Sequence, residues 1–273
     1  MRTEKRTKGR REGGRKRYGF GLKELAQLSE PQAIEILQQY GLLRKWKRCP
    51  YCRSQRFGLG RRYHWRCWRC RREWSPRKGS VLERFRIGYG CFLWTVKLFE
   101  LGVPAQRAAE QLQLSAPTVY KLYRMIREVL QKAQQKEKPL GGEIEADETY
   151  IGGHRKRIRG RSRAGKIPVL GLRQRGGPLR LILLPDVSRA TLHRAISRHV
   201  QPGSLIYIDS FRSYWGLGQK RWIHRILNKA EEGFRKGPIC LNGVEGAWGW
   251  LKVHLRRFRG IPHRSYPLYL AEA

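Results

Sequence analysis

The sequence predicts a multidomain chain, in which a small cysteine-bearing β unit and an all-helical region are followed by an α/β domain with a mixed sheet. Three observations support this prediction. Two C-x-x-C pairs flank residues 53–66, apolar residues recur at helical spacing through residues 89–131, and strand patterns alternate with helix patterns after residue 142. A length of 273 residues is more than one small core needs and suits two or three compact units.

The chain carries 59 Lys and Arg against 21 Asp and Glu, a formal net charge of +38. A field of this size attracts a polyanion, so nucleic acid is the leading expected partner and an anionic membrane surface a distant second. No run approaches the roughly 18 apolar residues of a membrane-spanning helix. Residues 1–20 are expected to form a disordered basic arm, either a solubilising tail or a contact to the DNA backbone. The basic loop of residues 152–166 is expected to grip DNA, or to be merely flexible.

Residues 21–46 are expected to form a helical lead-in. Leucines and isoleucines recur there at roughly helical spacing, and "SEPQ" has the character of a helix start.

Residues 47–78 are predicted to be a zinc ribbon. Cys49 and Cys52 form one C-x-x-C pair, and Cys67 and Cys70 form the other. This separation can close a tetrahedral four-thiolate site with no open position, which is a structural arrangement; the alternative is four free thiols in a small β unit. The cysteine pattern also indicates metal binding in a reducing compartment rather than a disulfide scaffold. Arginines interleaved with tryptophans are typical of a nucleic-acid surface, although tryptophans also pad small ribbons.

Residues 79–131 are predicted to be a helix-turn-helix DNA-binding region. An apolar helix stops at Gly102, a second helix opens at Pro104, "QLS" makes a turn, and a third helix follows. In a helix-turn-helix motif the second helix enters the major groove, but any three-helix bundle shows the same periodicity. The ribbon and the charge favour the DNA-binding reading. Residues 132–142, polar and ending in Pro and two glycines, are the predicted linker.

Residues 143–273 are predicted to form the α/β domain. "EIEADETYIGG" alternates Ile144 and Ala146 with acids, so a strand here buries these two residues and turns Glu145 and Asp147 to the other face. A hairpin, a capped helix, a short buried strand and a long amphipathic helix follow in "PVLGLRQRGGPLRLILLPDV", "SRATLHRAISRHV", "GSLIYIDS" and "NGVEGAWGWLKVHLRRF". These elements make an α/β unit with a mixed sheet.

Two of the three aspartates, Asp147 and Asp209, lie on predicted strands. Carboxylates gathered in one pocket repel each other unless a cation such as Mg²⁺ neutralises them. Two such ions about 3.5–4 Å apart stabilise the attacking and leaving oxygens of a phosphodiester displacement. Glu245 is the best candidate for a third carboxylate, because the same stripe of its helix also carries Lys252 and Arg256. An equally good interpretation is that Glu245 is an ordinary acid in the first turn of a helix, favoured by the helix dipole. The sequence thus predicts a divalent metal site for phosphodiester chemistry.

The other acids have weaker claims on this site. Asp186 is interpreted as a loop acid just ahead of a helix start. Glu143, Glu145 and Glu148 remain possible ligands, and periodicity disfavours Glu148 because it points to the opposite face from Asp147.

With these residues in hand, residues 20–270 resemble DDE-type insertion-sequence transposases of the ISXO2-like group, which have an N-terminal zinc ribbon and an RNase H-like catalytic domain. "ADETYIGG" matches the first catalytic segment. "IYIDSFRSY" stands where the family has a T-D-G-W-x-A-Y-like stretch, and "NGVEGAWGWLK" where it has N-x-I-E-x-F-W-x-x-L-K. "CPYC" and "CWRC" match the ribbon.

The resemblance implies that Asp147, Asp209 and Glu245 form the catalytic triad and bind Mg²⁺ or Mn²⁺, and that Lys252 contacts phosphate. It implies binding to the terminal inverted repeats of the mobile element, cleavage that frees 3′-hydroxyls, and joining of these ends to target DNA. Because two element ends are handled together, it also implies a homo-oligomer in a synaptic complex. The expected location is the bacterial cytoplasm, in association with the nucleoid and not with a membrane.

The chain also departs from the family pattern. Ser210 replaces the usual glycine after the second aspartate, Ala247 replaces an aromatic residue, and "KGPICLNG" replaces a histidine-rich lead-in. The chain stops at Ala273, where the family continues, so a C-terminal truncation is expected. Two rival functions follow: a non-enzymatic zinc-ribbon and helix-turn-helix DNA-binding regulator, and an inactive transposase remnant that still binds ends. The regulator has no use for acids on two strands and a helix.

Overall fold

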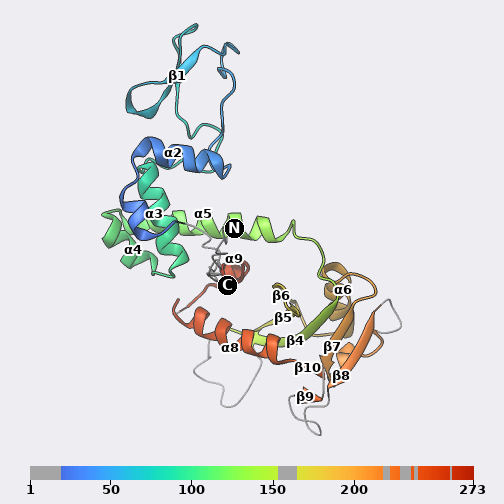
Figure 1. Cartoon of the computed structure of the whole chain (residues 1–273). Coiled ribbons are helices and arrows are strands. Elements are labelled where there is room, and N and C mark those ends of the chain that lie inside the picture. The colour runs from blue at the N-terminus through green and yellow to red at the C-terminus, as the bar shows by residue number, and fades with distance from the viewer. Residues whose placement is uncertain (1–19, 153–164, 218–221, 228–234, 237–238, 259) are drawn as a thin grey trace, which may run out of the picture. The chain divides into compact units, whose positions relative to one another are not determined.

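The computed structural model describes residues 20–152, 165–217, 222–227, 235–236, 239–258 and 260–273 (Figure 1). The chain divides into two compact units, Met1–Met125 and Ile126–Ala273. The boundary between them falls inside helix α5 (Ala116–Gln134). This helix extends into residues 132–142, which the sequence predicts to be a linker. The domain limits drawn from the sequence remain predictions. The predicted basic arm, apart from Phe20, and residues 153–164 of the basic loop lie outside the described residues.

The helices of the N-terminal unit confirm the helical lead-in and the helix-turn-helix pattern. Besides α5 they are α1 (Leu22–Ala26), α2 (Glu30–Gln39), α3 (Tyr89–Glu100) and α4 (Ala105–Leu112). The carboxylate of Glu30 joins α2 to α3, because it accepts the backbone N–H groups of Tyr89 at 2.8 Å and Gly90 at 2.9 Å. The turn between α4 and α5 begins at Gln113, whose φ of 53° is left-handed. One apolar core collects side chains from α1, α2, α3 and α5.

The cysteine-bearing segment is a small antiparallel sheet. Its strands are β1 (Phe57–Leu59), β2 (Trp65–Cys67) and β3 (Glu73–Trp74), in the order β1-β2-β3, with the 3-10 turn η1 (Arg61–Tyr63) between the first two. Cys49, Cys67 and Trp74 are its buried centre. A core this small does not stabilise a fold by itself.

The C-terminal unit is built on a five-stranded mixed sheet with the order β6-β5-β4-β7-β8. The strands are β4 (Glu143–Ile151), β5 (Ile167–Gln174), β6 (Leu179–Leu183), β7 (Leu205–Asp209) and β8 (Ile223–Leu227). β4, β5 and β6 are antiparallel neighbours, whereas β7 and β8 run parallel to β4. An antiparallel meander extended by two parallel strands is the sheet of the RNase H-like fold, so the predicted fold class is confirmed.

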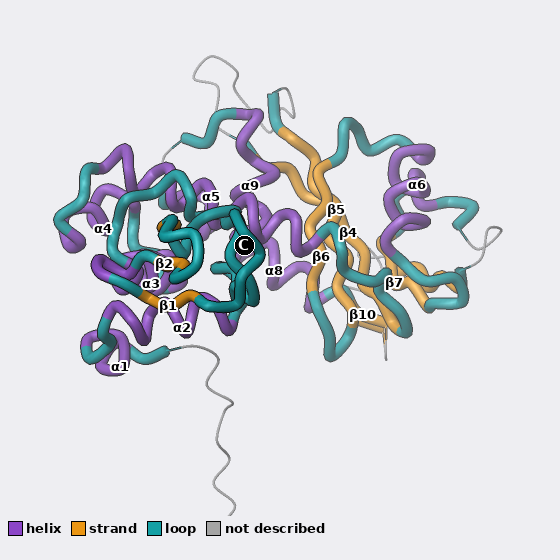
Figure 2. The backbone as a smooth tube through the Cα atoms, turned by 90° about the horizontal axis from the view of Figure 1, so that it is seen from above, coloured by secondary structure: helices purple, strands orange, loops and turns teal. Residues whose placement is uncertain are grey.

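Helices cover both faces of this sheet (Figure 2). α6 (Arg189–His199) packs on one face over a core that includes Ile144 and Ala146. α8 (Asn242–Arg256) and α9 (Tyr266–Glu272) pack on the other face, over Ile151 and Val169. The predicted alternation along β4 is therefore confirmed, and the acidic face of the strand is covered as well. Its acids consequently lie in a partly desolvated layer, where their charges need partners.

Several elements of this unit were not predicted from the sequence. They are strand β8, the two-stranded sheet of β9 (Arg235–Lys236) and β10 (Ile239–Cys240), the 3-10 turns η2 (Arg212–Tyr214) and η3 (His263–Ser265), and helix α9. The sequence of β8 does not predict a strand, because its apolar residues do not alternate with polar ones. Its two isoleucines, Ile223 and Ile226, are 59% and 41% exposed in the structure. Its strand conformation depends on pairing with β7, a long-range contact that local periodicity does not record.

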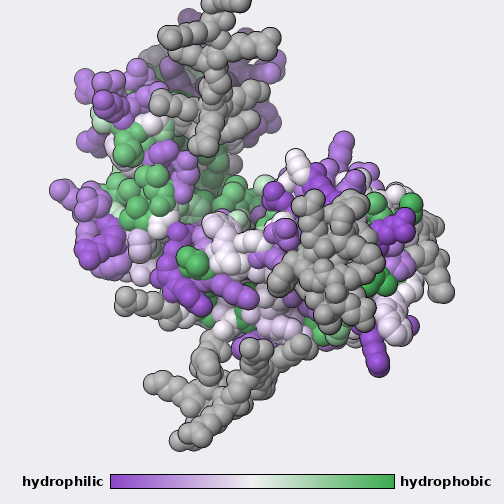
Figure 3. Space-filling view, turned by 60° about the horizontal axis from the view of Figure 1, so that its bottom comes forward, coloured by the Kyte–Doolittle hydropathy of each residue, from purple (hydrophilic) through white to green (hydrophobic). Residues whose placement is uncertain are grey.

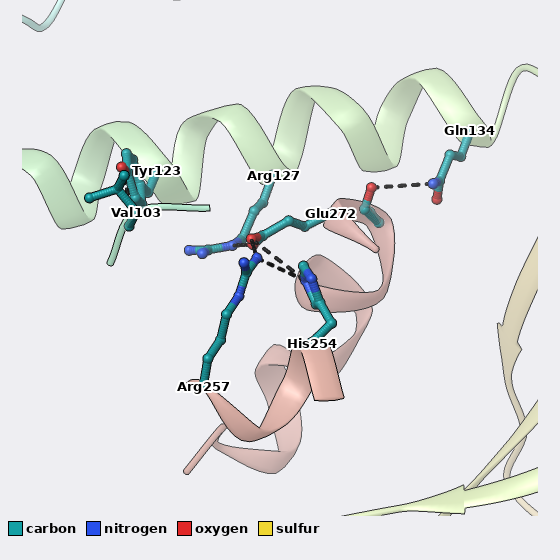
Figure 4. A network of polar contacts seen from close by, with 8 residues as sticks. Val103, Tyr123, Arg127, Gln134, His254, Arg257 and Glu272 are labelled. Atoms are coloured by element: carbon teal, nitrogen blue, oxygen red, sulfur yellow. Dashed lines mark hydrogen bonds and ion pairs between the residues drawn. The ribbon is translucent and has the colours of Figure 1, made fainter. Parts of the chain in front are cut away.

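A buried ion cluster joins three helices within the C-terminal unit (Figure 4). Glu272 of α9 accepts from Arg127 of α5 at 2.6 Å and from Arg257, just after α8, at 2.8 Å. Burial, followed by the charge of Arg257, lowers the pKa of the neighbouring His254. Glu272 thus ties the C-terminal end of α8, the helix that carries Glu245 and Lys252, to α5 and α9.

Hydrophilic residues form much of the face seen in Figure 3. Among the described residues, no helix is both long and apolar enough to cross a bilayer.

Candidate active site and zinc centre

The side chain of Asp147 lies between β4 and α8. It is 8% exposed, and its Oδ2 accepts the indole N–H of Trp248 at 2.9 Å. Gly171 lies directly opposite Asp147 on β5. A Cβ at this glycine would lie 2.5 Å from the Trp248 ring and 2.8 Å from Val244. The absence of a side chain at 171 thus lets α8 approach closely enough for Trp248 to orient the carboxylate.

We expect Gly171→Ala to destabilise the chain by about 1–3 kcal/mol, because the new methyl group overpacks the contact between β5 and α8. Gly246→Ala is the matched control, since nothing lies within 4 Å of a Cβ there, and alanine inside a helix stabilises by up to about 1 kcal/mol. Urea unfolding at equilibrium measures both changes. Equal free energies of unfolding for Gly171→Ala and the native chain would contradict the close approach.

Glu143 and Glu145, considered as possible metal ligands, are engaged in other contacts. Oε2 of Glu145, 4% exposed, accepts the N–H of Val244 at 3.0 Å, and Oε1 accepts from Arg175 at 3.3 Å. Glu143 accepts from the same arginine at 2.8 Å and from Tyr207 at 2.8 Å. A carboxylate at the first turn of a helix satisfies free N–H groups and complements the helix dipole. Glu145 therefore holds the N-terminus of α8 against the sheet.

Asp209 ends β7, the strand next to β4. β4 and β7 run parallel with Glu145 beside Tyr207, so by the same register Asp147 and Asp209 point to one face of the sheet. Oδ1 of Asp209 accepts the N–H of Phe211 at 3.0 Å, which fixes the direction of the carboxylate. Both aspartates act electrostatically on Glu148. The two predicted catalytic aspartates are thus brought together on neighbouring strands.

Glu245 and Lys252 lie on α8. Glu245 is half-buried in the first turn, three residues before Trp248 and hence on an adjoining part of the helix surface. Lys252 is exposed two turns farther along. The buried stripe of Val244, Trp248 and Leu251 is as predicted. The helix therefore turns Glu245 and Lys252 to the side of that stripe.

The donor set of Asp147, Asp209 and Glu245 suits a hard divalent cation, which prefers carboxylate oxygens. Among the described residues, the four ribbon cysteines form a group whose ligand atoms all lie within 4.8 Å of one another, and the three carboxylates do not form such a group. Two ions about 3.5–4 Å apart, each about 2.1 Å from its oxygens, spread their ligands over roughly 8 Å. Carboxylates that do not converge on one point can therefore still hold a pair of ions.

Glu148 faces away from Asp147, as the alternation predicts, yet it is electrostatically part of the site. Burial raises the pKa of Glu148 to about 7; the hydrogen bond from Tyr214 at 2.7 Å lowers it, and the charges of Asp209 and Asp147 raise it further. Sequence reasoning assigned no role to Tyr214, although its position five residues after Asp209 in "DSFRSY" was a usable signal. The pair links the end of β4 to the turn that follows β7.

The raised pKa predicts a pH dependence of stability in metal-free buffer. The folded pKa of about 7 lies above the ordinary 4.5, so the neutral carboxyl stabilises the fold fully below pH 4.5 and this contribution is lost as pH rises through 7. Glu148→Gln removes the titration. We expect the variant to gain up to about 3 kcal/mol over the native chain between pH 4.5 and 8. Urea titrations across that range measure the difference, and a constant difference would contradict the burial of Glu148.

The four predicted zinc ligands Cys49, Cys52, Cys67 and Cys70 converge in the ribbon. Sγ of Cys49 lies 3.7 Å from that of Cys70, and Sγ of Cys52 lies 3.5 Å from that of Cys67. A tetrahedral zinc site with bonds of about 2.3 Å has sulfur–sulfur edges of roughly 3.8 Å, so the spacing fits zinc.

The titration of these thiols points the same way. The backbone N–H of Cys70 is the main cause that lowers the pKa of Cys67 to about 6. At Cys70 the N–H of Arg72 also lowers the pKa, but burial and the neighbouring sulfurs outweigh it and raise the value to about 11. Four thiols this close cannot all ionise without a cation, so the arrangement is suited to a metal ion that neutralises them.

Asp186 stands apart from both sites. Its Oδ1 accepts the N–H of Ser188, the residue that caps α6, at 2.8 Å, and hydrogen bonds from Ser188 lower its pKa. The interpretation as a loop acid ahead of a helix is confirmed.

Comparison with known proteins gives three matches. The ISXO2-like transposase domain matches residues 139–273. An "Uncharacterized transposase-like protein" of Haemophilus influenzae is 36% identical over 91 residues, which cover 33% of this chain and 73% of that protein. The crystal structure of the Mos1 strand transfer complex aligns with 66% of this chain and 72% of its own chain at 13% identity, but its TM-score of 0.28 is too low to support an argument. On the domain match and the Haemophilus relative together, the chain belongs to the ISXO2-like transposase family.

Proposed function

We propose that this chain is a transposase that binds the terminal inverted repeats of an insertion sequence, cleaves the DNA there and joins the freed 3′ ends to target DNA. One observation carries the proposal. Asp147 and Asp209 lie on neighbouring parallel strands and face the same side, and the helix that bears Glu245 is held to Asp147 through Trp248. A regulator that only binds DNA needs no such gathering of carboxylates, because they repel the DNA backbone.

In this proposal Asp147, Asp209 and Glu245 hold Mg²⁺ or Mn²⁺. The bound ions supply positive charge at the reacting phosphate and at the oxygens that attack and leave. The indole of Trp248 and the N–H of Phe211 keep the two aspartates in fixed orientations, which avoids reorganisation during the reaction. Lys252, exposed on α8, contacts a DNA phosphate.

The reaction consists of two phosphodiester displacements. In the first, water attacks the phosphorus at the element end, the bond to the 3′ oxygen breaks, and a 3′-hydroxyl and a 5′-phosphate result. In the second, this 3′-hydroxyl attacks a phosphodiester of the target strand and displaces the target's own 3′ oxygen. The number of phosphodiester bonds is conserved in the second step, so no external energy source is needed.

Recognition of the element end belongs in this proposal to the N-terminal unit. We assign base reading to the start of α5, the second helix of the expected helix-turn-helix, where the side chains of Pro117, Tyr120 and Lys121 are exposed. The zinc ribbon and the net charge of +38 add contacts to the phosphate backbone. Because two ends react together, the active species is a homo-oligomer, and it acts on DNA in the bacterial cytoplasm.

The purified protein incubated with labelled duplex that matches the DNA ends flanking its own gene tests this proposal. We expect nicking in Mg²⁺ that leaves a 3′-hydroxyl, none in EDTA, and none on a duplex of the same length with scrambled sequence. Binding to the end duplex without nicking, in Mg²⁺ and in Mn²⁺, would overturn catalysis and leave a regulator or an inactive remnant.

A further inference from the structure

A cavity of about 450 Å³ lies beside the candidate active site, between the end of β4 and the second half of α8. Tyr150 and Gly152 line it from the strand side, and Lys252 and Arg256 line it from the helix. Its volume falls within the roughly 300–1,000 Å³ of small-molecule sites, and it is far larger than a single phosphate group requires. The cavity therefore has room for a nucleotide-sized ligand.

The charge of the cavity selects an anion. Of the described residues, Lys166, Lys252 and Arg256 line it, and no Asp or Glu does. Within the described part of the chain, no ion pair joins these three cations to an acid, whereas other arginines of the same unit are paired. Arg127, Arg175, Arg180 and Arg257 each have a glutamate oxygen within 3.1 Å. Three cations on one concave surface without an acid form a site for phosphate.

The remaining walls suit a base rather than a second phosphate. Leu255 and Ile261 supply apolar surface, and two tyrosines border the same space: Tyr150, which is half-buried, and Tyr266, which is 8% exposed. Aromatic side chains beside a cationic groove are how proteins hold unstacked bases, and each stacked base contributes about 1–3 kcal/mol. The cavity thus combines the two kinds of surface that one nucleotide presents.

The position of the cavity relates it to the reacting strand. Along α8, Lys252 is seven residues from Glu245, which is about 10 Å. Along β4, Tyr150 is three residues from Asp147, again about 10 Å. Stacked duplex rises 3.4 Å per nucleotide, so about 10 Å spans roughly three nucleotides, and fewer in an unstacked strand.

We propose that this cavity holds one nucleotide of the DNA strand, turned out of the helix, one to three positions from the reacting phosphate. Lys166, Lys252 and Arg256 bind its phosphates, and the base lies against the tyrosines. Taking a base out of the stack costs a few kcal/mol, which the base contacts in the cavity offset. This inference rests on the proposed function for the identity of the strand, and it adds a specific place where that strand is distorted beside the active site.

Photo-cross-linking tests the inference separately from catalysis. The probe is a single-stranded dT octamer with one 5-iodouracil, bound to the full-length Asp209→Asn chain in Ca²⁺ buffer. Mass spectrometry then locates the cross-linked peptides. We expect cross-links on the peptides that contain Tyr150 or Tyr266. Cross-links found only elsewhere would overturn the inference.

Two charge reversals provide a matched comparison. Arg256→Glu is expected to lower the cross-link yield at these peptides at least tenfold, while Arg264→Glu, an exposed cation outside the cavity, should lower it less than threefold. Equal yields in the two variants would overturn the inference. Ile261→Trp keeps the charge and fills the cavity, and it should also remove the cross-link.

A second measurement needs no variant of the cavity. An octamer with an abasic position in place of the iodouracil should compete at least fivefold more weakly than unmodified dT octamer, and inorganic phosphate should compete only weakly. Equal competition by the abasic strand would mean that phosphate alone is bound and would overturn the base site. If end duplex is nicked but no cavity cross-link forms, the proposed function stands and this inference fails. If the cavity cross-link forms but end duplex is not nicked, the nucleotide site stands and the proposed catalysis fails.

Discussion

Asp209→Asn is expected to abolish metal-dependent nicking of the end duplex while leaving DNA binding intact. The substitution keeps the shape of the side chain and the Oδ1 that accepts the Phe211 N–H at 3.0 Å, but it removes one negative charge from the proposed metal site. Metal ions contribute several kcal/mol of charge stabilisation to such displacements, which corresponds to a rate loss of roughly 10²–10³-fold or more. Gel assays of nicking and binding, run on the same preparations, measure both effects.

Asp186→Asn is the matched control for this experiment. The chemical change is identical, but Asp186 lies before α6 and accepts from Ser188, and asparagine serves nearly as well as aspartate at such a position. We expect nicking within about twofold of the native chain. If Asp209→Asn nicked DNA as well as Asp186→Asn does, Asp209 would have no part in catalysis and the proposed triad would be wrong.

The large elements of the C-terminal unit could be predicted because each carries its own periodicity. The alternation of Ile144 and Ala146 with acids predicted β4, and the stripe of Val244, Trp248 and Leu251 predicted the buried side of α8. The same patterns placed Asp147 and Asp209 on strands. They left open how the strands pair, and it is the parallel pairing of β4 with β7 that brings the two aspartates together.

The contacts that shape the site could not be predicted, because they join residues far apart in the sequence. Glu145 shares the face of Asp147, and spacing alone left both as possible metal ligands. The packing of α8 on the sheet distinguishes their roles. Glu145 accepts a hydrogen bond from the N–H of Val244, whereas Asp147 accepts one from the indole of Trp248. The need for glycine at position 171 could not be predicted either, because it arises from the close packing of α8 against that position. Periodicity disfavours Glu148 as a ligand but leaves it possible, and it gives no sign of the burial that raises the pKa of this carboxyl to about 7.

Removal of zinc is expected to unfold the ribbon. The buried centre of the ribbon is Cys49, Cys67 and Trp74, too little apolar surface for independent stability. Structural zinc contributes about 10–16 kcal/mol in small zinc-finger units, which is as large as a domain's entire net stability of about 5–15 kcal/mol. Without the metal, no cation neutralises the thiolates, so their mutual repulsion and the cost of burying their charge destabilise the ribbon.

The predicted result is one zinc ion per chain by metal analysis, and loss of amide protection in residues 49–74 after treatment with a strong chelator. Cys67→Ser should behave as the chelated protein, because serine is a poor zinc ligand and the site has no spare donor. Cys91→Ser, a thiol of α3 outside the cluster, should keep its zinc and its protection. Protection in β4 and β7 should persist in every case, since the cysteine ligands belong to the other compact unit. A ribbon that stays protected in Cys67→Ser would show that its aromatic packing suffices and that the four thiols are not a structural metal site.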